Sequence, residues 1–392
     1  MIALLSPIRK ALRTLALPFA ALTLAACDDV AVGGLTGPLI DTSRPVTVAL
    51  LVPSGSGSSG DNVLAQSLEN AARLAVADLN GVDVDLRVYS TGGDAANAAN
   101  QALRAVSEGA QIILGPVYAS SANAAGVAVA SRNINVLSFS NNTDIAGGNV
   151  FVLGPTFENT ASRLVRYASS QGKSRILVLH AQDPAGTLGR DAIRNAAARS
   201  GATIAGVVDY PLSQEGVVAA VPRVRAAVDG SGADALFLTS STATALPLLT
   251  QLLPEAGVGP ETTQYIGLTR WDLPPQTLDL PGVQGGWFAL PDPNRSAAFR
   301  SRYQAAYGAS PHPIGALAYD GVAAIGALVS QRGSNALTGA ALTQNAGFQG
   351  ASGVFRLRPD GTNERGLAVA TIQNRQVVQL SPAPQSFGGA GF

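Results

Sequence analysis

The sequence predicts an α/β protein of two similar lobes, each with a parallel-rich sheet and helices on both faces. Three observations support this fold class. Strand-like and helix-like stretches alternate along most of the chain, one strand–helix–strand unit at 109–142 is complete, and its first part returns in a second copy. The chain also has 392 residues, 46% of them hydrophobic and 13% charged, which is enough for two cores.

The unit at 109–142 shows how the first lobe is organised. Gln111–Leu114 is rich in β-branched residues, Gly115-Pro116 ends it, Ser120–Ser131 is Ala-rich at helical spacing, and Asn135–Ser140 is a second strand. A crossover of this length returns the second strand parallel to the first, so the loops after both strands open at one carboxyl edge. Open α/β sheets place their ligand crevice at this edge.

The remaining elements follow the same alternation. In the first lobe we predict strands at 46–52, 85–89 and 151–153, and helices at 62–79 and 95–108. The stretch AVSEGAQIILGP (105–116) has a similar counterpart in the second lobe, AVDGSGADALFLTSS (227–241). In that lobe we predict strands at 174–180, 203–210 and 233–239 and helices at 190–198 and 216–228. Later segments are helices at 244–253, 297–307 and 314–331, strands at 264–268 and 285–289, and a hairpin of 348–356 with 367–373 that turns at 359–361.

The first 26 residues resemble a secretory signal. Arg9, Lys10 and Arg13 precede an apolar run, Leu15–Leu24, that is too short for a stable membrane span. The following Leu24-Ala25-Ala26-Cys27 resembles the lipobox of bacterial lipoproteins, in which the cysteine is diacylated and becomes the first residue. Cys27 is the only cysteine, so disulfides are excluded and we expect a lipid anchor there.

The net charge of the chain and the composition of its two ends narrow the possible functions and the extent of the folded part. Without residues 1–26 the chain has 23 bases and 26 acids, a net charge of −3, and no basic stripe with interleaved aromatics that would indicate a nucleic-acid surface. Residues 27–44 are expected to be a flexible tether, and 381–392 a disordered tail. Asp28 and Asp29 follow the cysteine, a pair that marks inner-membrane retention in some bacteria, so the inner and outer membranes both stay open.

Four stretches carry a resemblance to a known family. They are GPVYASS at 115–121, FRSRYQAAYG at 299–308, AYDGV at 318–322 and GASGVFRLRPDG at 350–361. With the order of elements, they resemble a type I periplasmic-binding-protein domain of the leucine-binding group over about 45–380. The resemblance implies two Rossmann-like lobes joined by three crossovers, the first of 45–155 plus 288–345 and the second of 156–287 plus 346–380.

The same resemblance implies a ligand cleft lined by loops at the strand ends. The polar residues that we expect to line it are Ser54, Ser120, Ser121, Ser138, Ser140, Asn141, Asp183, Ser240 and Arg270. In amino-acid binders of this group a serine-rich loop and a helix N-terminus take the ligand carboxylate, a role open to Ser120 and Ser121. Equally, both serines are typical helix caps.

Two departures argue against a free amino acid as ligand. The position of the aromatic that covers the ligand in amino-acid binders is Ala185, and the stretch that supplies the acid for the ammonium is Ser240–Thr244, which has no carboxylate. An ammonium buried without a charged partner costs several kcal/mol. Leucine-like ligands are therefore disfavoured.

The sequence offers no assembled catalytic or metal-binding chemistry. The glycine-rich loop Ser54–Gly60 lacks the Lys-Ser/Thr of a phosphate loop, His180 and His312 are far apart, and no nucleophile elbow occurs. With its single cysteine at the N-terminus, the chain has no Cys/His cluster for zinc. We therefore expect no enzyme activity, no cofactor and no metal.

The leading functional hypothesis is a periplasmic lipoprotein, anchored to the outer or inner membrane, that activates a penicillin-binding protein in peptidoglycan synthesis. The FSNNTD stretch at 139–144, the lipoprotein signal and the low aromatic content are similar to the activators of that class. Trp271, between Arg270 and Asp272, is the expected partner contact, although it could also be a core residue. The alternative is a solute-binding lipoprotein of an ABC importer for a small polar ligand.

Overall fold

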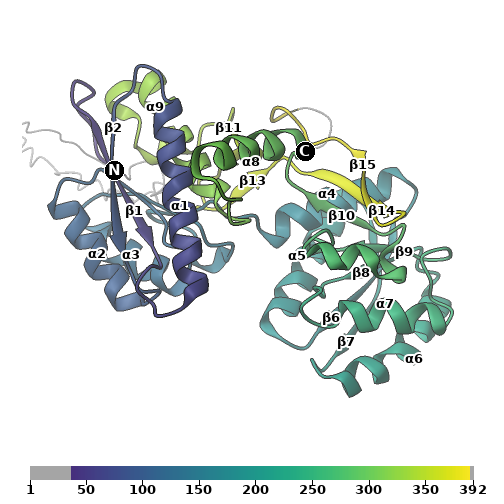
Figure 1. Cartoon of the computed structure of the whole chain (residues 1–392). Coiled ribbons are helices and arrows are strands. Elements are labelled where there is room, and N and C mark those ends of the chain that lie inside the picture. Colours follow the sequence, from purple (N-terminus) through teal and green to yellow (C-terminus); the bar gives the residue numbers. More distant parts are fainter. Residues whose placement is uncertain (1–36, 389–392) are drawn as a thin grey trace, which may run out of the picture. The chain divides into compact units, whose positions relative to one another are not determined.

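Two separate sheets organise the chain in the computed structural model, which describes residues 37–388 (Figure 1). The signal segment, Cys27 and the first part of the predicted tether lie outside the described residues. The predicted α/β class with parallel-rich sheets and helices on both faces is confirmed. Within residues 37–388, no helix combines the length and the apolar character needed to cross a bilayer.

The first sheet has five parallel strands in the order β2-β1-β3-β4-β5. Their bounds are β1 Val46–Val52, β2 Val84–Ser90, β3 Ile112–Leu114, β4 Val136–Ser138 and β5 Val150–Val152. β3 and β4 pair in parallel with Ile113 opposite Val136, which confirms the strand–helix–strand unit predicted at 109–142. The loops after these strands therefore share one carboxyl edge.

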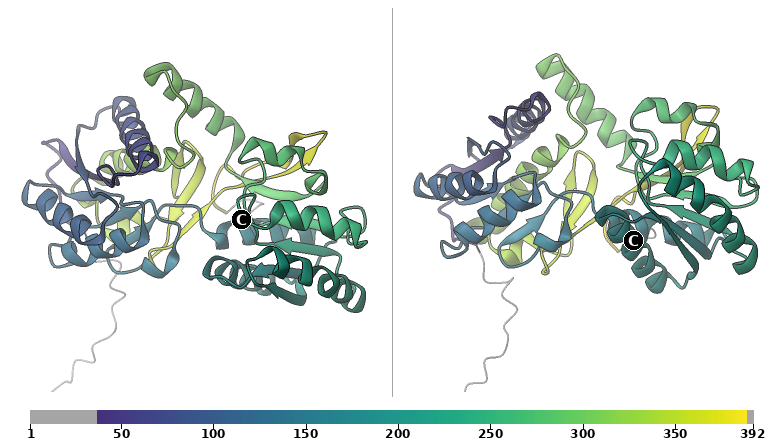
Figure 2. Two further views of the ribbon diagram at one scale, coloured as in Figure 1. Left: turned by 60° about the horizontal axis from the view of Figure 1, so that its bottom comes forward. Right: turned by 90° about the horizontal axis from the view of Figure 1, so that it is seen from below.

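Four helices cover the two faces of the first sheet (Figure 2). The helices are α1 Ser59–Asp78 and α9 Ala316–Arg332 on one face, and α2 Ala95–Ser107 and α3 Ala119–Ala130 on the other. Because side chains alternate along a strand, Val48 and Leu50 pack toward α1 and α9, whereas Ala49 and Leu51 pack toward α2 and α3. All four of these strand residues are fully buried, as expected of a sheet covered on both sides.

The second sheet has seven strands in the order β15-β14-β10-β9-β8-β6-β7. The parallel strands are β6 Arg175–Ala181, β7 Thr203–Tyr210, β8 Ala235–Leu238, β9 Gln264–Gly267 and β10 Trp287–Leu290, and the antiparallel ones are β14 Ala368–Gln373 and β15 Gln376–Ser381. One face packs on α4 Phe157–Ser170 and α5 Pro184–Ser200, the other on α6 Gln214–Ser231 and α7 Leu246–Glu255.

A third, small antiparallel sheet corrects the predicted late hairpin. It consists of β11 Phe348–Gly350, β12 Gly353–Leu357 and β13 Asn363–Arg365. β12 pairs with β13 across the predicted turn, whereas β14 joins the second sheet, so the predicted pairing of 348–356 with 367–373 is wrong. Phe348 and Phe355 belong to the core of the first lobe, so the assignment of residues 346–365 to the second lobe is also wrong.

The remaining short elements complete the lobes. They are α8 Pro293–Tyr307, α10 Gly339–Leu342 and the 3₁₀ turns η2 Thr143–Ile145, η3 Pro275–Asp279, η4 Pro281–Val283 and η5 Gly333–Asn335. α8 lies against α1, where Asn70 Nδ2 donates to Tyr303 Oη at 3.1 Å. β10 belongs to the second sheet, so the first lobe resumes with α8, later than the predicted residue 288.

Buried polar side chains hold the crossovers between the sheets in place. The chain passes from one lobe to the other after β5, after β10 and after β13, as expected for three crossovers. Asn363 Nδ2 donates to Val152 O and Gly154 O at 2.8 Å each. Arg365 donates to Leu153 O and pairs with the fully buried Asp320 at 3.0 Å. These contacts satisfy the backbone of the crossing strands where it leaves the sheets.

Both described ends of the chain are packed, which the sequence did not predict. Gly37 and Asn133 exchange two hydrogen bonds of 2.9 Å, and Ile40 is buried in the first core, so the predicted tether of 27–44 does not extend unchanged through residues 37–40. At the other end Ala383 is buried and Arg356 lies 4.6 Å over the Phe387 ring. The prediction of disorder for 381–392 is therefore wrong up to residue 388.

Candidate functional site

The carboxyl edge of the first sheet gathers the serine-rich loops that the sequence singled out. Ser54 follows β1, and its Oγ lies 2.6 Å from Ser90 Oγ at the end of β2. Ser138, at the end of β4, donates through Oγ to Pro116 O in the loop after β3 at 3.0 Å. The structure therefore places the loops after β1, β2, β3 and β4 side by side at one edge, although the residues come from distant parts of the chain.

The start of α3 at this edge has no side-chain cap. Its N-cap position is Tyr118. Ser120 is exposed, whereas Ser121 is buried and donates through Oγ to Gly93 O at 3.3 Å, so the interpretation of these serines as helix caps is wrong. An uncapped helix start presents N–H groups and positive potential, which favour a carboxylate or another hydrogen-bond acceptor.

Two of the other predicted residues shape the loop after β4 instead of offering free groups. Ser138 Oγ accepts from Ser140 N at 3.1 Å, and Ser140 Oγ accepts from Asn142 N at 3.1 Å. Both serines are buried. Asn141, which follows Ser140, is exposed. Of the predicted first-lobe residues, Ser54, Ser120 and Asn141 thus retain accessible side chains.

A tyrosine–aspartate contact at the same edge was not singled out from the sequence. Tyr118 is 38% exposed, and its Oη donates to Asp61 Oδ1 in the first turn of α1. Hydrogen bonds from Tyr118 and then Ser56 lower the pKa of the Asp61 carboxyl. These residues are 57 positions apart, so no local sequence signal could have paired them.

The carboxyl edge of the second sheet is different, because its acids already have partners. Asp183 caps α5, with Oδ1 accepting from Gly186 N at 2.6 Å. Asp209, at the end of β7, pairs with Arg223 at 2.9 Å. Asp272 is 15% exposed, and its two carboxylate oxygens accept from Nε and Nη2 of Arg270. A ligand ammonium at this edge would have to displace one of these partners.

Two further predicted positions fall on this edge. Ser240 follows β8 and is buried. Ala185 lies exposed in the first turn of α5, next to Asp183, so no aromatic ring from that position covers a ligand. Together with the paired acids, these residues give the second edge neither a free carboxylate nor an aromatic cover.

Trp271 does not form a partner contact, so this prediction is wrong. Its side chain has 0% exposure and belongs to the core of the second lobe. The ring fills space above two glycines: a Cβ on Gly267 would lie 2.3 Å from it, and one on Gly286 2.2 Å. Arg270 and Asp272 flank the tryptophan at the surface, but the aromatic ring itself is inaccessible.

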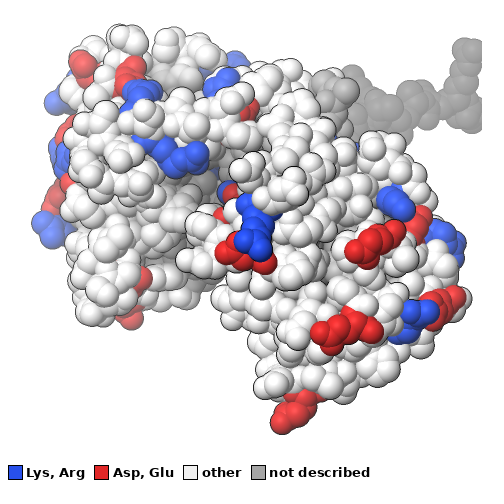
Figure 3. All heavy atoms as spheres, turned by 45° about the vertical axis from the view of Figure 1, so that its right-hand side comes forward, with Lys and Arg blue, Asp and Glu red and all other residues white. Residues whose placement is uncertain are grey.

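The two histidines lie in different parts of the fold. His180 is buried at the end of β6, with Nδ1 2.8 Å from Ala181 O. Burial lowers the pKa of His312, which lies before α9. Residues 37–388 contain no group of three or more His, Cys, Asp or Glu side chains placed to hold a metal ion. Charged side chains are sparse on the face in Figure 3, and most lie beside one of opposite sign.

The family of the chain is indicated by a match that covers most of it. A family described as periplasmic binding protein matches residues 45–376, which include all three crossovers and every strand of the two large sheets except β15. No curated protein matches the chain.

Solved structures share the fold at low sequence identity. A Rhodospirillum rubrum protein named for branched-chain amino acid ABC transport has a TM-score of 0.73 and 19% identity, over 86% of this chain and 100% of that one. A branched chain amino acid ABC transporter periplasmic ligand-binding protein from Burkholderia xenovorans has a TM-score of 0.69 and 20% identity, over 88% and 97%. An ABC transporter substrate-binding protein from Desulfitobacterium hafniense, in complex with Leu, has a TM-score of 0.63 and 17% identity, over 86% and 100%.

Proposed function

The chain belongs to the periplasmic binding protein family, and we propose that it is the solute-binding component of an ABC importer. Membership of this family implies a periplasmic location. The names of the solved relatives, which describe ABC transporter substrate-binding proteins, support this role over the activator role. As in two-lobed binding proteins generally, the ligand would stabilise a closed arrangement of the lobes through hinge motion.

We propose further that the ligand carries a carboxylate, an amide or another acceptor but no free ammonium. The observation that carries this proposal is the contrast between the two sheet edges. The first edge offers the uncapped start of α3 with the exposed Ser120. At the second edge the acids are committed, Asp183 to the start of α5 and Asp272 to Arg270. A ligand with an acceptor group gains contacts at the first edge, whereas an ammonium gains no partner at the second.

Three ligands of one shape test this proposal. Isothermal titration calorimetry compares leucine, 4-methylpentanoate, which lacks the ammonium, and leucinamide, which lacks the carboxylate. We expect 4-methylpentanoate to bind more tightly than leucine, and leucinamide to bind weakest. Ser120→Ala should weaken binding of the carboxylate, whereas Ser131→Ala, at the far end of the same helix, is the matched control. Tighter binding of leucine than of 4-methylpentanoate would contradict the proposal.

The second candidate function is activation of a penicillin-binding protein. The second sheet edge supports this function, because a protein without a partner for a ligand ammonium need not serve amino-acid uptake. The FSNNTD stretch at 139–144 also resembles the activators. An activator would act by binding one conformation of the synthase more tightly than another. Capture of a penicillin-binding protein from solubilised envelopes, with faster glycan polymerisation in vitro and no small-molecule binding, would favour this function over solute binding.

The lipid anchor at Cys27 is part of both proposals. Diacylation would hold the protein at a membrane through its N-terminus, with residues 28–36 between the lipid and the packed segment that begins at Gly37. Mass spectrometry of the N-terminal peptide tests it directly. The peptide should carry acyl chains in the native protein and lose them in Cys27→Ser, which should also release the protein from the membrane fraction.

A further inference from the structure

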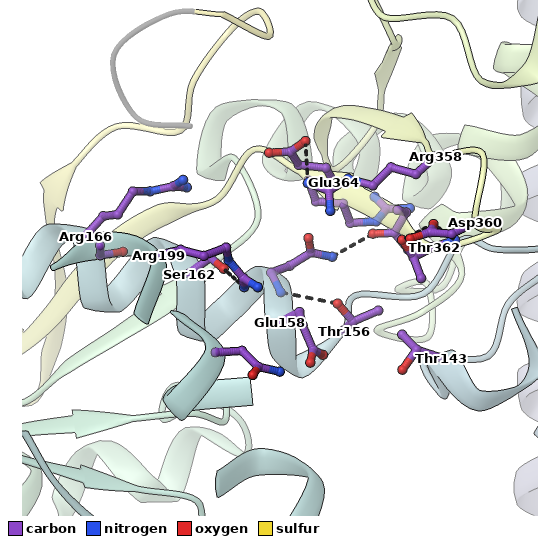
Figure 4. A pocket seen from close by; sticks show the side chains of 15 residues that line it. Thr143, Thr156, Glu158, Ser162, Arg166, Arg199, Arg358, Asp360, Thr362 and Glu364 are labelled. Carbon is purple, nitrogen blue, oxygen red and sulfur yellow. Dashed lines mark hydrogen bonds and ion pairs between the residues drawn. The ribbon is translucent and has the colours of Figure 1, made fainter. Parts of the chain in front are cut away.

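A polar pocket is formed where the chain crosses between the two lobes (Figure 4). Its volume is about 430 Å³, within the range of small-ligand sites. All 15 lining residues have polar or charged side chains, so the pocket cannot be an apolar gap in a core. It combines the first turns of α4, the last turn of α5, the turn between β12 and β13, and Thr143.

Guanidinium groups dominate one part of this pocket. Arg166 of α4 and Arg199 of α5 lie on the same side in Figure 4, and Arg358 reaches in from the β12–β13 turn. Burial lowers the pKa of the half-buried Arg166, and the nearby positive charge of Arg199 adds to this shift against the opposing effect of Glu364. Two guanidiniums close together raise the local positive potential.

Three carboxylates, Glu158, Asp360 and Glu364, also line the pocket, and they differ in how they are engaged. Glu364 Oε2 is shared by Arg356 at 2.6 Å and Arg358 at 3.0 Å. Asp360 accepts from its neighbour Thr362 at 2.6 Å and lies on the opposite side of the view from Arg199, and Glu158 is in the first turn of α4. Among residues 37–388, no carboxylate pairs with Arg199, whose Nη2 donates to the neutral Ser162 Oγ at 3.2 Å.

We infer that this pocket binds a small oxyanion, with inorganic phosphate or a phosphomonoester as the ligand class. Arg199 would supply the charge-assisted hydrogen bonds and Ser162 Oγ a neutral one, while the nearby Arg166 adds positive charge. Contact with Thr143 and the β12–β13 turn on one lobe, and with α4 and α5 on the other, makes the anion a bridge across the crossovers. This inference does not depend on the ligand proposed for the sheet edges.

Calorimetric titration of the full-length protein with sodium phosphate tests the inference, at an ionic strength held constant with sodium chloride. We expect one saturable phosphate site per chain. Arg199→Gln should weaken phosphate binding about tenfold, because it removes a charged donor and keeps a hydrogen-bonding side chain. Arg194→Gln, an exposed arginine on the same helix that does not line the pocket, should leave binding unchanged.

A second variant keeps the test decisive if Arg199→Gln unfolds. Arg358→Gln also removes a lining guanidinium, and Glu364 keeps Arg356 as its partner. It should weaken phosphate binding severalfold with an unchanged circular dichroism spectrum. The inference is overturned if phosphate does not saturate, if chloride competes equally, or if Arg199→Gln and Arg194→Gln behave alike.

Discussion

The two sheet edges have the same topology but use their polar residues differently. At the first edge the helix that follows β3 starts without a cap, and an exposed serine lies beside it. At the second edge the helix that follows β6 is capped by Asp183, and Arg270 and Asp272 bind each other. Similar loop chemistry in the sequence therefore leaves a helix start uncapped in one lobe and caps a helix in the other.

The largest expected effect is on the free energy of unfolding, and it tests whether Trp271 is part of the core beneath the second edge. Trp271→Ala should lower the free energy of unfolding by about 3–5 kcal/mol, because it empties a fully buried site above Gly267 and Gly286. Chemical denaturation monitored by circular dichroism measures the change. Arg270→Ala is the control, and it should cost at most about 1 kcal/mol because its ion pair is partly exposed. Similar costs for the two variants would contradict a buried role for Trp271.

A smaller effect tests the space that the tryptophan fills. Gly267→Ala should destabilise the protein by about 1–3 kcal/mol, because its Cβ would meet the indole ring at 2.3 Å. In the Trp271→Ala background the same substitution should cost little, and the double-mutant cycle gives the coupling. An additive result would mean that the ring does not occupy this space.

The caps give the most direct comparison between the edges. Asp183→Ala should cost about 1 kcal/mol of stability, because the Gly186 N–H loses its acceptor at the start of α5. Ser120→Ala should change stability by less than about 0.5 kcal/mol, because its exposed side chain caps nothing in α3. Asp183→Asn, which can still cap, should behave nearly as the native protein. Equal losses at positions 183 and 120 would remove the difference between the edges.

The sequence predicted the features that depend on local pattern. The apolar runs before Gly115 and after Arg175 specified buried strands, and the crossover between β3 and β4 followed from its length. Fold class and crossovers could therefore be predicted. The pairing of β12 with β13 could not be predicted. The sequence does not show that Phe348 and Phe355 pack with α9 in the core of the first lobe.

The residues of the site were harder to predict because their roles depend on distant neighbours. Trp271 between two charged residues suggested a surface anchor, but Gly267 and Gly286 make room for it in the core. Asp183 could be a cap or a ligand contact from its sequence alone. The arginine pocket was missed altogether, since Arg166, Arg199 and Arg358 come from separate parts of the chain and no spacing links them.

The smallest expected effect concerns the acid of the first edge, Asp61, which is held by a neutral tyrosine and not by a cation. The hydrogen bond from Tyr118, followed by that from Ser56, keeps the Asp61 pKa below its ordinary value of 3.8. A carboxyl with a lowered folded pKa adds stability above its unfolded pKa, and this contribution disappears as the pH falls through the folded pKa. Tyr118→Phe should therefore raise the Asp61 pKa in an NMR titration.

Ser56→Ala is the matched variant for that titration. It should raise the Asp61 pKa less than Tyr118→Phe, because the tyrosine hydroxyl makes the stronger contribution. A ligand acceptor bound at the start of α3 would lie next to Tyr118, the residue at its N-cap position, and could compete with Asp61 for the hydroxyl. We therefore expect a bound carboxylate ligand to raise the Asp61 pKa as well. An unchanged pKa in the presence of such a ligand would place its binding away from this edge.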